Sequence, residues 1–316
     1  MLCKTTLVQL LALLPAAVVG EYTLREVGGR NTLDWRVWLE SNGKVVSFWH
    51  DVPVYPVPED RRIINMVVEI PRWNDAKIEI KRSEPMNPIF HDDKNDLPRF
   101  VESVWPHKSY PFLYGSIPQT WESPNFEHDF TNFPGDNDPI DVFDIGLDPG
   151  YVGQIKQVKM LGGIAVADGE ETDWKILAID VNDTLAELVN SIEDLEKYRP
   201  NIAKTFYDWF TYYKVARGDS LIPIVGEAYQ SAAFIEDVVA KGHKYWAELV
   251  AGQVKPGEIN YNQTSMPELE NSYVSACNVS KNFGIPATSN VLPAAEKPAK
   301  YDRWYYLNEK FELIKI

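Results

Sequence analysis

The sequence predicts an α+β domain in which helices pack on the flank of a closed or nearly closed antiparallel barrel. Short segments rich in β-branched and aromatic residues fill the first part of the chain. Turns containing Gly and Pro separate these segments, and segments with helical periodicity follow them. Strands followed by helices are the order typical of the α+β class.

The expected strands are apolar segments of strand length, and residues 76–81 alternate strictly between apolar and charged side chains. Such alternation is typical of a strand with one buried face. Strands are expected over 35–40, 45–49, 63–70, 76–81, 152–160 and 174–181.

The expected helices carry apolar residues at the spacing of one helix face. Pro200 stands at a position suited to a first helical turn. The aromatic stripe that follows it is expected to pack in the core rather than to bind a cofactor. Helices are expected over 185–195, 200–213 and 234–249.

Residues 1–20 are predicted to be a signal peptide, because Lys4 precedes the apolar run 7–14 and small residues lie before Glu21. No later stretch reaches the ~18 apolar residues that a membrane span needs. We therefore expect a protein of the secretory pathway, secreted or vacuolar, with a cytoplasmic location as the alternative if the segment is not processed. The sequons at Asn262 and Asn278 fit that route.

Composition is that of an ordinary globular protein, with 45% hydrophobic and 24% charged residues in 316. The formal charge of −15 makes a nucleic-acid or acidic-membrane partner unexpected, since both require a basic surface. We expect a main domain over 21–253. The Pro- and Ser-bearing remainder, 254–316, is expected to be an extended tail.

The most informative motif is the acidic run 135–146, which sets Asp136, Asp138 and Asp141 around a proline between apolar residues. Carboxylates forced together where water is scarce require cations. Hard oxygen donors without nearby Cys or His favour Mg²⁺, Mn²⁺ or Ca²⁺ over zinc.

Three alternative structures fit the acidic run less well. A solvated loop would not carry the apolar residues that flank the acids. An EF-hand loop needs Gly at its sixth position and Glu at its twelfth, where this chain has Asp141 and Leu147. An aspartyl-phosphate phosphatase needs its Asp pair at the end of an apolar strand, but a turn-like segment precedes this pair.

Two further pairs place a carboxylate beside an ammonium. Lys77 and Glu79 are two residues apart and share one face of an expected strand, and Asp173 and Lys175 repeat the arrangement. Glu69 lies within an apolar strand, where a buried carboxylate needs a partner. The two pairs could instead face solvent.

Residues 135–141 resemble the signature of the soluble family I inorganic pyrophosphatases, and the chain is similar to the eukaryotic, fungal-like branch of that family from about residue 22 to 213. The order and spacing of several segments carry this resemblance together. They are 65–73, 76–79, 99–101, 114–115, 118–122, 171–175 and 212–214.

The resemblance implies a twisted five-stranded barrel of OB type with helices on its flank. It implies hydrolysis of pyrophosphate to two orthophosphates by a metal-activated water, with several Mg²⁺ ions per site and Mn²⁺ or Co²⁺ as substitutes. It also implies a homodimer, for which Arg72, Trp73 and the aromatic cluster 304–306 are the expected contacts, although Trp73 could be core.

The resemblance also implies a role for each candidate site residue. It makes Asp138 the general base and gives the remaining residues to metals or phosphates. The metal candidates are Asp136, Asp141, Asp173, Asp168, Glu79 and Glu69, and the phosphate candidates are Lys77, Arg99, Tyr114, Lys175, Tyr213 and Lys214.

Two other functions remain open at this point. The first is another metal-dependent phosphohydrolase activity, on short polyphosphate or nucleoside diphosphates. The second is a non-catalytic binding module on the same fold, which the loss of any acid in the cluster would favour.

Overall fold

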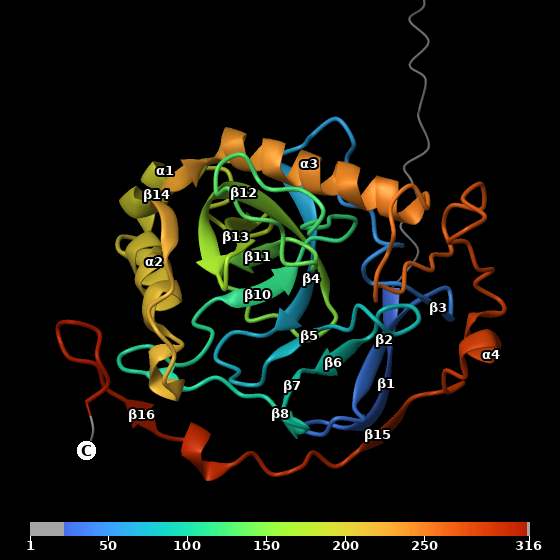
Figure 1. The fold of residues 1–316 in the computed structure, drawn as a ribbon, viewed down its shortest axis with the longest axis horizontal. Coiled ribbons are helices and arrows are strands. Elements are labelled where there is room, and N and C mark those ends of the chain that lie inside the picture. The colour runs from blue at the N-terminus through green and yellow to red at the C-terminus, as the bar shows by residue number, and fades with distance from the viewer. Residues whose placement is uncertain (1–21, 315–316) are drawn as a thin grey trace, which may run out of the picture.

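The computed structural model describes residues 22–314, so the predicted signal peptide lies outside the described residues. Five strands pair in a closed ring in the order β4, β10, β11, β13, β12 and back to β4. Figure 1 shows this ring at the centre of the molecule, with α3 lying across it. The ring consists of β4 (Ile63–Ile70), β10 (Leu113–Ser116), β11 (Asp141–Asp144), β12 (Ile155–Asp168) and β13 (Glu171–Asp180).

One pair in the ring differs from the expected antiparallel arrangement. β11 and β13 are parallel, and Asp141 lies opposite Lys175. The long strand β12 turns back into β13 as an antiparallel hairpin, so β13 returns in the direction of β11. The parallel pairing brings the starts of β11 and β13, which both carry predicted site residues, to the same end of the ring.

A second sheet lies beside the ring and includes part of the expected tail. Its order is β15, β1, β2, β6, β5, with β3 paired to β2. The tail strand β15 runs parallel to β1, and Figure 1 shows the tail following the lower edge of the molecule. The strands are β1 (Tyr22–Gly29), β2 (Arg36–Ser41), β3 (Lys44–Val46), β5 (Ile78–Ile80), β6 (Ile89–His91) and β15 (Asn290–Leu292).

The remaining strands are short or peripheral. β14 pairs with the outer side of β12, and the tail strand β16 runs parallel to β9. The strands are β7 (Asp93–Lys94), β8 (Leu97–Pro98), β9 (Ser103–Val104), β14 (Ile224–Ser231) and β16 (Trp304–Tyr305).

Helices cover the ring from two sides. The aromatic stripe of α2 is core, as predicted, because Phe206 and Trp209 are almost fully buried. α3 contacts β12. The helices are α1 (Ile192–Tyr198), α2 (Ile202–Tyr212), α3 (Ala232–Val250) and α4 (Val279–Phe283), with 3-10 turns η1 (Val215–Arg217) and η2 (Ala299–Tyr301). None of the helices in the described part of the chain is long and apolar enough to cross a bilayer.

The prediction of a helix over 185–195 was wrong in its extent. Asp183 accepts the backbone N–H of Leu185 at 2.9 Å, which favours a turn over a helix. The helix begins after Ser191, whose hydroxyl caps the backbone N–H of Asp194 at 3.2 Å. It ends before Pro200, which disfavours helical geometry at the preceding residue.

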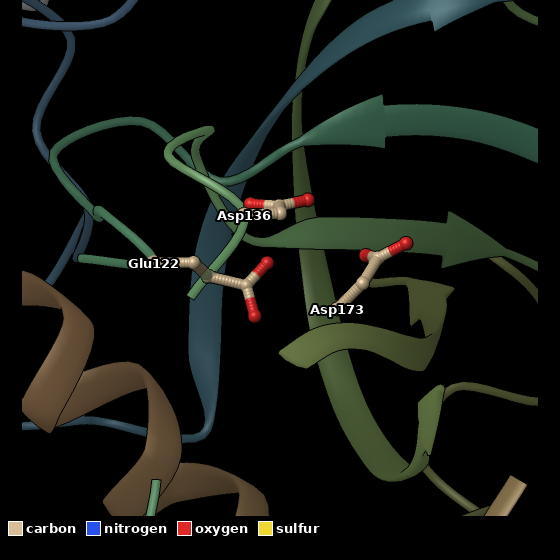
Figure 2. A group of neighbouring side chains, drawn as sticks. All are labelled: Glu122, Asp136 and Asp173. Atoms are coloured by element: carbon tan, nitrogen blue, oxygen red, sulfur yellow. The ribbon is translucent and has the colours of Figure 1, made fainter. Parts of the chain in front are cut away.

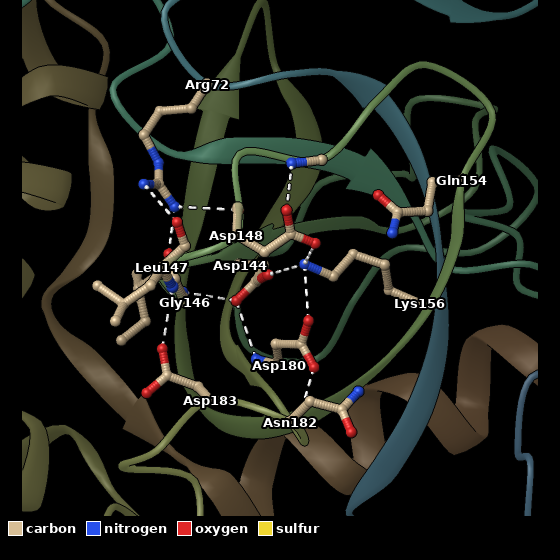
Figure 3. A network of polar contacts seen from close by, with 12 residues as sticks. Arg72, Asp144, Gly146, Leu147, Asp148, Gln154, Lys156, Asp180, Asn182 and Asp183 are labelled. Carbon is tan, nitrogen blue, oxygen red and sulfur yellow. Dashed lines mark hydrogen bonds and ion pairs between the residues drawn. The ribbon is translucent and has the colours of Figure 1, made fainter.

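A buried ion cluster fixes the far ends of β11 and β13 (Figure 3). The Lys156 ammonium lies 2.8 Å from carboxylate oxygens of both Asp144 and Asp180. Asp144 also accepts the backbone N–H groups of Gly146 and Asp180. A buried ammonium requires such partners, and their position ties the two strands together at the end opposite Asp141.

Candidate active site

One cavity at the near end of the ring collects every site residue predicted from the sequence. The cavity lies where the starts of β11 and β13, the loop before β11, and strands β4, β5 and β10 converge. Its predicted lining residues are Glu69, Lys77, Glu79, Arg99, Tyr114, Asp136, Asp138, Asp141, Asp168, Asp173, Lys175, Tyr213 and Lys214.

The loop that carries Asp136 and Asp138 is a tight turn rather than an extended stretch. Asn137 has φ +74°, and a carboxylate oxygen of Asp136 accepts the backbone N–H of Asp138 at 3.0 Å. The loop pairs with Glu122, whose carbonyl accepts the Asn137 N–H at 2.9 Å. A Cβ on Gly135 would lie 2.3 Å from the Glu122 carbonyl, so only glycine permits this approach.

Three carboxylates meet on one side of the cavity. Glu122, Asp136 and Asp173 each place an oxygen within 4.8 Å of the others (Figure 2). One Glu122 oxygen accepts the Trp174 backbone N–H at 3.0 Å. The other oxygen is buried, and no hydrogen-bond partner for it occurs among residues 22–314.

The pKa values of these groups show that negative charge is concentrated there. Burial, with the charges of Asp173 and Asp138, raises the pKa of Asp136 well above its usual range. Burial, with Asp136 and Asp173, does the same to the pKa of Glu122. Burial also raises the pKa of Asp173 to about 6, although Lys175 acts in the opposite direction. An oxygen-only donor set with excess negative charge fits a hard divalent cation.

Lys175 joins the two carboxylates at the strand starts. Its ammonium contacts Asp141 and lies 2.6 Å from an oxygen of Asp173. The other Asp141 oxygen accepts the Tyr114 hydroxyl at 2.9 Å. Burial alone would lower the pKa of Lys175, but Asp141 and Asp173 raise it well above its usual value. Lys175 is therefore a permanent cation between the two acids.

Asp138 stands apart from this group and pairs with a cation instead. An Asp138 oxygen lies 2.9 Å from a guanidinium nitrogen of Arg82. Burial and the charge of Glu79 raise the pKa of Asp138 to about 6, and Arg82 acts against both. A carboxylate with a pKa near 6 is ionised at neutral pH and basic enough to accept a proton.

Lys77, directly before β5, and Glu79, within β5, form the predicted pair. Their side chains lie 2.8 Å apart, and the Lys77 ammonium is 3.1 Å from the Tyr114 hydroxyl. Burial raises the pKa of Glu69 to about 8. Glu69 accepts the Ser116 hydroxyl and the Ile80 backbone N–H, both at 3.0 Å. These two hydrogen bonds are the partners that a carboxylate buried in an apolar strand requires.

Two further cations and an aromatic side chain complete the lining of the cavity. Arg99 lies 2.8 Å from Asp92, and Lys214 pairs with Asp168. The Tyr213 ring stacks on the buried Trp209 ring at 4.4 Å, and burial raises the tyrosine pKa. Tyr213 therefore stays a neutral hydroxyl donor at physiological pH.

Sequence reasoning missed four residues of this neighbourhood. Arg82 and Asp92 pair with predicted site residues, Glu122 joins the acidic group, and the Tyr110 ring stacks on Tyr114 at 5.7 Å. Asp92 lines the cavity and the other three contact residues that line it, and tertiary packing rather than local spacing places all four there. Only Glu122 had a signal in the sequence, since it ends one of the segments that carry the family resemblance.

Comparisons with known proteins agree with this geometry. The protein-family profile described as "Inorganic pyrophosphatase" matches residues 66–247. The chain is 44% identical to an inorganic pyrophosphatase of Eremothecium gossypii over 289 residues, covering 91% of this chain and 98% of the relative. It is 40% identical to the inorganic pyrophosphatase of Schizosaccharomyces pombe over 292 residues, covering 92% and 99% of the two chains.

Solved structures give the same result. The inorganic pyrophosphatase of Schistosoma japonicum superposes with a TM-score of 0.83 at 33% identity, covering 90% of this chain and all of that one. A vacuolar soluble pyrophosphatase of Trypanosoma cruzi, solved in complex with PPi, superposes with a TM-score of 0.68 at 32% identity, covering 79% and 99%. With a matching profile over more than half of its length and relatives above 40% identity along nearly all of it, this chain belongs to the inorganic pyrophosphatase family.

Proposed function

We propose that the chain hydrolyses inorganic pyrophosphate to two orthophosphates in a metal-dependent reaction at this cavity. The observation that carries the proposal is the charge of the cavity lining, which brings eight carboxylates together with four cations, Lys77, Arg99, Lys175 and Lys214. The carboxylates outnumber the cations, which leaves negative charge for metal ions to neutralise. Binding a tetra-anion in a protein of net charge −15 requires both metals and such a local group of cations.

The metals would be held by carboxylate oxygens alone. Asp136, Asp141 and Asp173 are the proposed ligands of the activating ions, with Glu79, Asp168 and Glu69 for further ions. Bound divalent cations would neutralise phosphate charge and acidify the attacking water. Mg²⁺ is the proposed ion because it favours a few carboxylates together with substrate phosphates, and Mn²⁺ or Co²⁺ would substitute.

Asp138 is the proposed general base. Its free oxygen accepts the proton of the attacking water, while its other oxygen stays on Arg82 at 2.9 Å. This contact fixes the carboxylate direction without neutralising it, since the Asp138 side chain remains 41% exposed.

The cations and tyrosines are proposed to bind the two phosphates. Arg99 offers a planar fork for two phosphate oxygens, and Lys77 and Lys214 act as point charges. Tyr114 contributes a neutral hydroxyl, because burial and the nearby Asp141 raise its pKa well above the usual value. Lys175 contacts Asp141 and Asp173, and we propose that it also binds a phosphate oxygen beside these acids.

Phosphate release from pyrophosphate by the purified full chain tests this function, with Mg²⁺ supplied or removed by a chelator. Short polyphosphate and a nucleoside diphosphate serve as competing substrates in the same assay. Faster turnover of either than of pyrophosphate would favour the other phosphohydrolase. Binding of pyrophosphate without release of phosphate would favour the non-catalytic module.

The finer features of the fold are part of the proposal as well. The closed pairing of the five strands supports a barrel of OB type. The parallel pairing of β15 with β1 supports the proposal that residues 254–316 form a separate segment that packs along the main domain.

We further propose a homodimer, because Trp73 is 57% exposed and does not lie in the core. The Arg72 guanidinium lies 5.6 Å from the centroid of the Trp73 ring, and Trp304 is exposed beside Trp105 at 5.2 Å. Light scattering should give a dimer for the wild type and a monomer for Trp73→Ala. The equally exposed Tyr151→Ala should remain dimeric; a wild-type monomer at micromolar concentration would refute the proposal.

Entry into the secretory pathway is the last part of the proposal, and it rests on the sequence of residues 1–20. Of the sequons at Asn262 and Asn278, the second is exposed at the start of α4, whereas the first is half-buried. N-terminal sequencing of native material should find Glu21 first, with glycan on Asn278. An intact Met1, with no mass change after glycosidase treatment, would refute it.

A further inference from the structure

A second cavity adjoins the active site on the far side of Arg99, with a volume of about 460 Å³. We call it the tail cavity, because the tail forms one wall and the β7–β8 hairpin and η1 form the others. Its charged lining residues are Lys94, Arg99, Glu102, Arg217, Glu296 and Lys300.

The tail wall is held in place by its own contacts. The Tyr301 ring packs against the core residue Phe100 with ring centroids 5.1 Å apart. The Lys297 ammonium lies 2.6 Å from a carboxylate oxygen of Asp75. Lys300 stands between these two anchors along the chain, and its exposed ammonium lies 4.7 Å from the centroid of the Tyr301 ring. Figure 1 shows the tail passing below β8 at this place.

The cavity carries more positive than negative charge in a strongly acidic protein. Four of its lining residues are cations and two are carboxylates. Among residues 22–314, neither Lys94 nor Lys300 has a carboxylate within ion-pair distance. Arg217 pairs at 2.6 Å with Asp219, which is itself 41% exposed and therefore contributes little to holding the guanidinium. These cations are available to a ligand.

Arg99 connects the tail cavity to the active site, since it lines both. One of its terminal nitrogens binds Asp92 at 2.8 Å. Its Nε is buried and has no hydrogen-bond partner in the part of the chain that the structure describes. A guanidinium has donors in several directions in its plane, so one group can serve anions on both sides.

We propose that the tail cavity is an accessory anion subsite that binds one phosphoryl group next to the pyrophosphate site. This inference rests on the proposed function, because the active-site substrate is taken to be pyrophosphate. Two sources carry the required chemistry: the distal phosphate of a linear polyphosphate longer than pyrophosphate, and free orthophosphate. In either case the phosphoryl group would lie among Arg99, Lys94, Lys300 and Arg217, which all line this cavity.

The test compares two double variants of the full chain that lose the same charge. Lys94→Ala with Lys300→Ala removes two cations of the tail cavity. Lys255→Ala with Lys281→Ala removes two exposed lysines elsewhere and serves as the control. Inhibition of pyrophosphate hydrolysis by tripolyphosphate, and separately by orthophosphate, is measured at fixed free Mg²⁺.

The inhibition constant of tripolyphosphate should rise about tenfold in the tail-cavity variant, as expected for two lost charge-assisted contacts, and stay within about twofold in the control. The KM for pyrophosphate should change little in both. If the inhibition constant of orthophosphate is unchanged, the subsite binds the distal phosphate of a polyphosphate. If the inhibition constant of orthophosphate rises as well, the subsite also binds free phosphate. Equal constants in the two double variants for both inhibitors would overturn the proposal.

Calorimetric binding of tripolyphosphate to the same proteins separates this inference from the proposed function. If the wild type released no phosphate from pyrophosphate, the function would fail, yet weaker tripolyphosphate binding by the tail-cavity variant alone would still support the subsite. If turnover is normal and the three proteins bind tripolyphosphate equally, the subsite fails and the function stands.

Discussion

Replacing Arg82 by Gln should shift the pH dependence of the reaction without removing any group that acts on substrate. Arg82 contacts Asp138 at 2.9 Å and Glu258 at 2.7 Å, and its charge lowers the pKa of the proposed base. Asp138 accepts a proton only when it is ionised. The acidic limb of the rate profile therefore follows its pKa, which burial and Glu79 raise to about 6.

The size of the shift follows from the exposure of the pair. The Arg82 and Asp138 side chains are 33% and 41% exposed, so solvent screens their attraction. Two unit charges about 3–4 Å apart in a water-like dielectric interact by about 1 kcal/mol, which corresponds to somewhat less than one pKa unit. The acidic limb should therefore move upward by about one pH unit or less.

The assay is kcat/KM for pyrophosphate from pH 5 to 9 at saturating Mg²⁺. Arg82→Gln should lose most activity near pH 6 and approach wild-type activity above pH 8. Arg30→Gln removes an exposed arginine that pairs with Glu26, away from the cavity, and its profile should match the wild type. An acidic limb at the wild-type position in Arg82→Gln would refute the assignment of that limb to Asp138.

Three other substitutions probe the metal site, the Gly135 turn and a buried histidine. Asp141→Asn removes a charged metal ligand and leaves Lys175 with one acid, so half-maximal activity should need about tenfold more Mg²⁺; an unchanged Mg²⁺ requirement would contradict the ligand role. Gly135→Ala forces a Cβ against the Glu122 backbone at 2.3 Å and should lower the unfolding free energy by about 1–3 kcal/mol, measured by denaturant titration against the wild type; an unchanged unfolding free energy would contradict this close approach. His50 is buried between Trp49 and Trp246, and burial lowers its pKa to about 3. Below pH 6.5 the unfolded chain takes up a proton on His50 that the folded chain excludes. As the pH falls from 6.5 to 5, the unfolding free energy of the wild type should therefore fall by up to about 1.4 kcal/mol per pH unit more than that of His50→Gln. Parallel pH dependence of the unfolding free energy in the two proteins would show that the ring is not held neutral.

Segments with strong local patterns could be predicted from the sequence. The strand over Ile63–Ile70 has the predicted bounds because its apolar run is uninterrupted and buried. The second and third helices were found from their apolar stripes. In contrast, β14 was missed because only one of its residues is buried and its side chains give no alternation. β15 pairs with a strand more than 260 positions earlier, for which local patterns hold no information.

The candidate site divides in the same way. The acids of residues 136–141 are local, and the spacing of Lys77 and Glu79, at and just before β5, predicted their contact. The parallel pairing of β11 and β13 could not be predicted from spacing, and this pairing brings Asp173 beside Asp141. Arg82 was missed for the same reason, since its contact with Asp138 crosses 56 positions.

Turnover of pyrophosphate by Asp138→Asn, measured with the Mg²⁺ dependence of the same protein, tests the central claim most directly. The substitution keeps size and polarity but cannot accept the proton of the attacking water. It should lower kcat by ~10²–10⁴-fold while the Mg²⁺ concentration for half-maximal activity stays near that of the wild type. Near-wild-type kcat in this variant would contradict the role of Asp138 as general base, and a wild-type protein that releases no phosphate with Mg²⁺, Mn²⁺ or Co²⁺ would contradict the proposed hydrolysis itself.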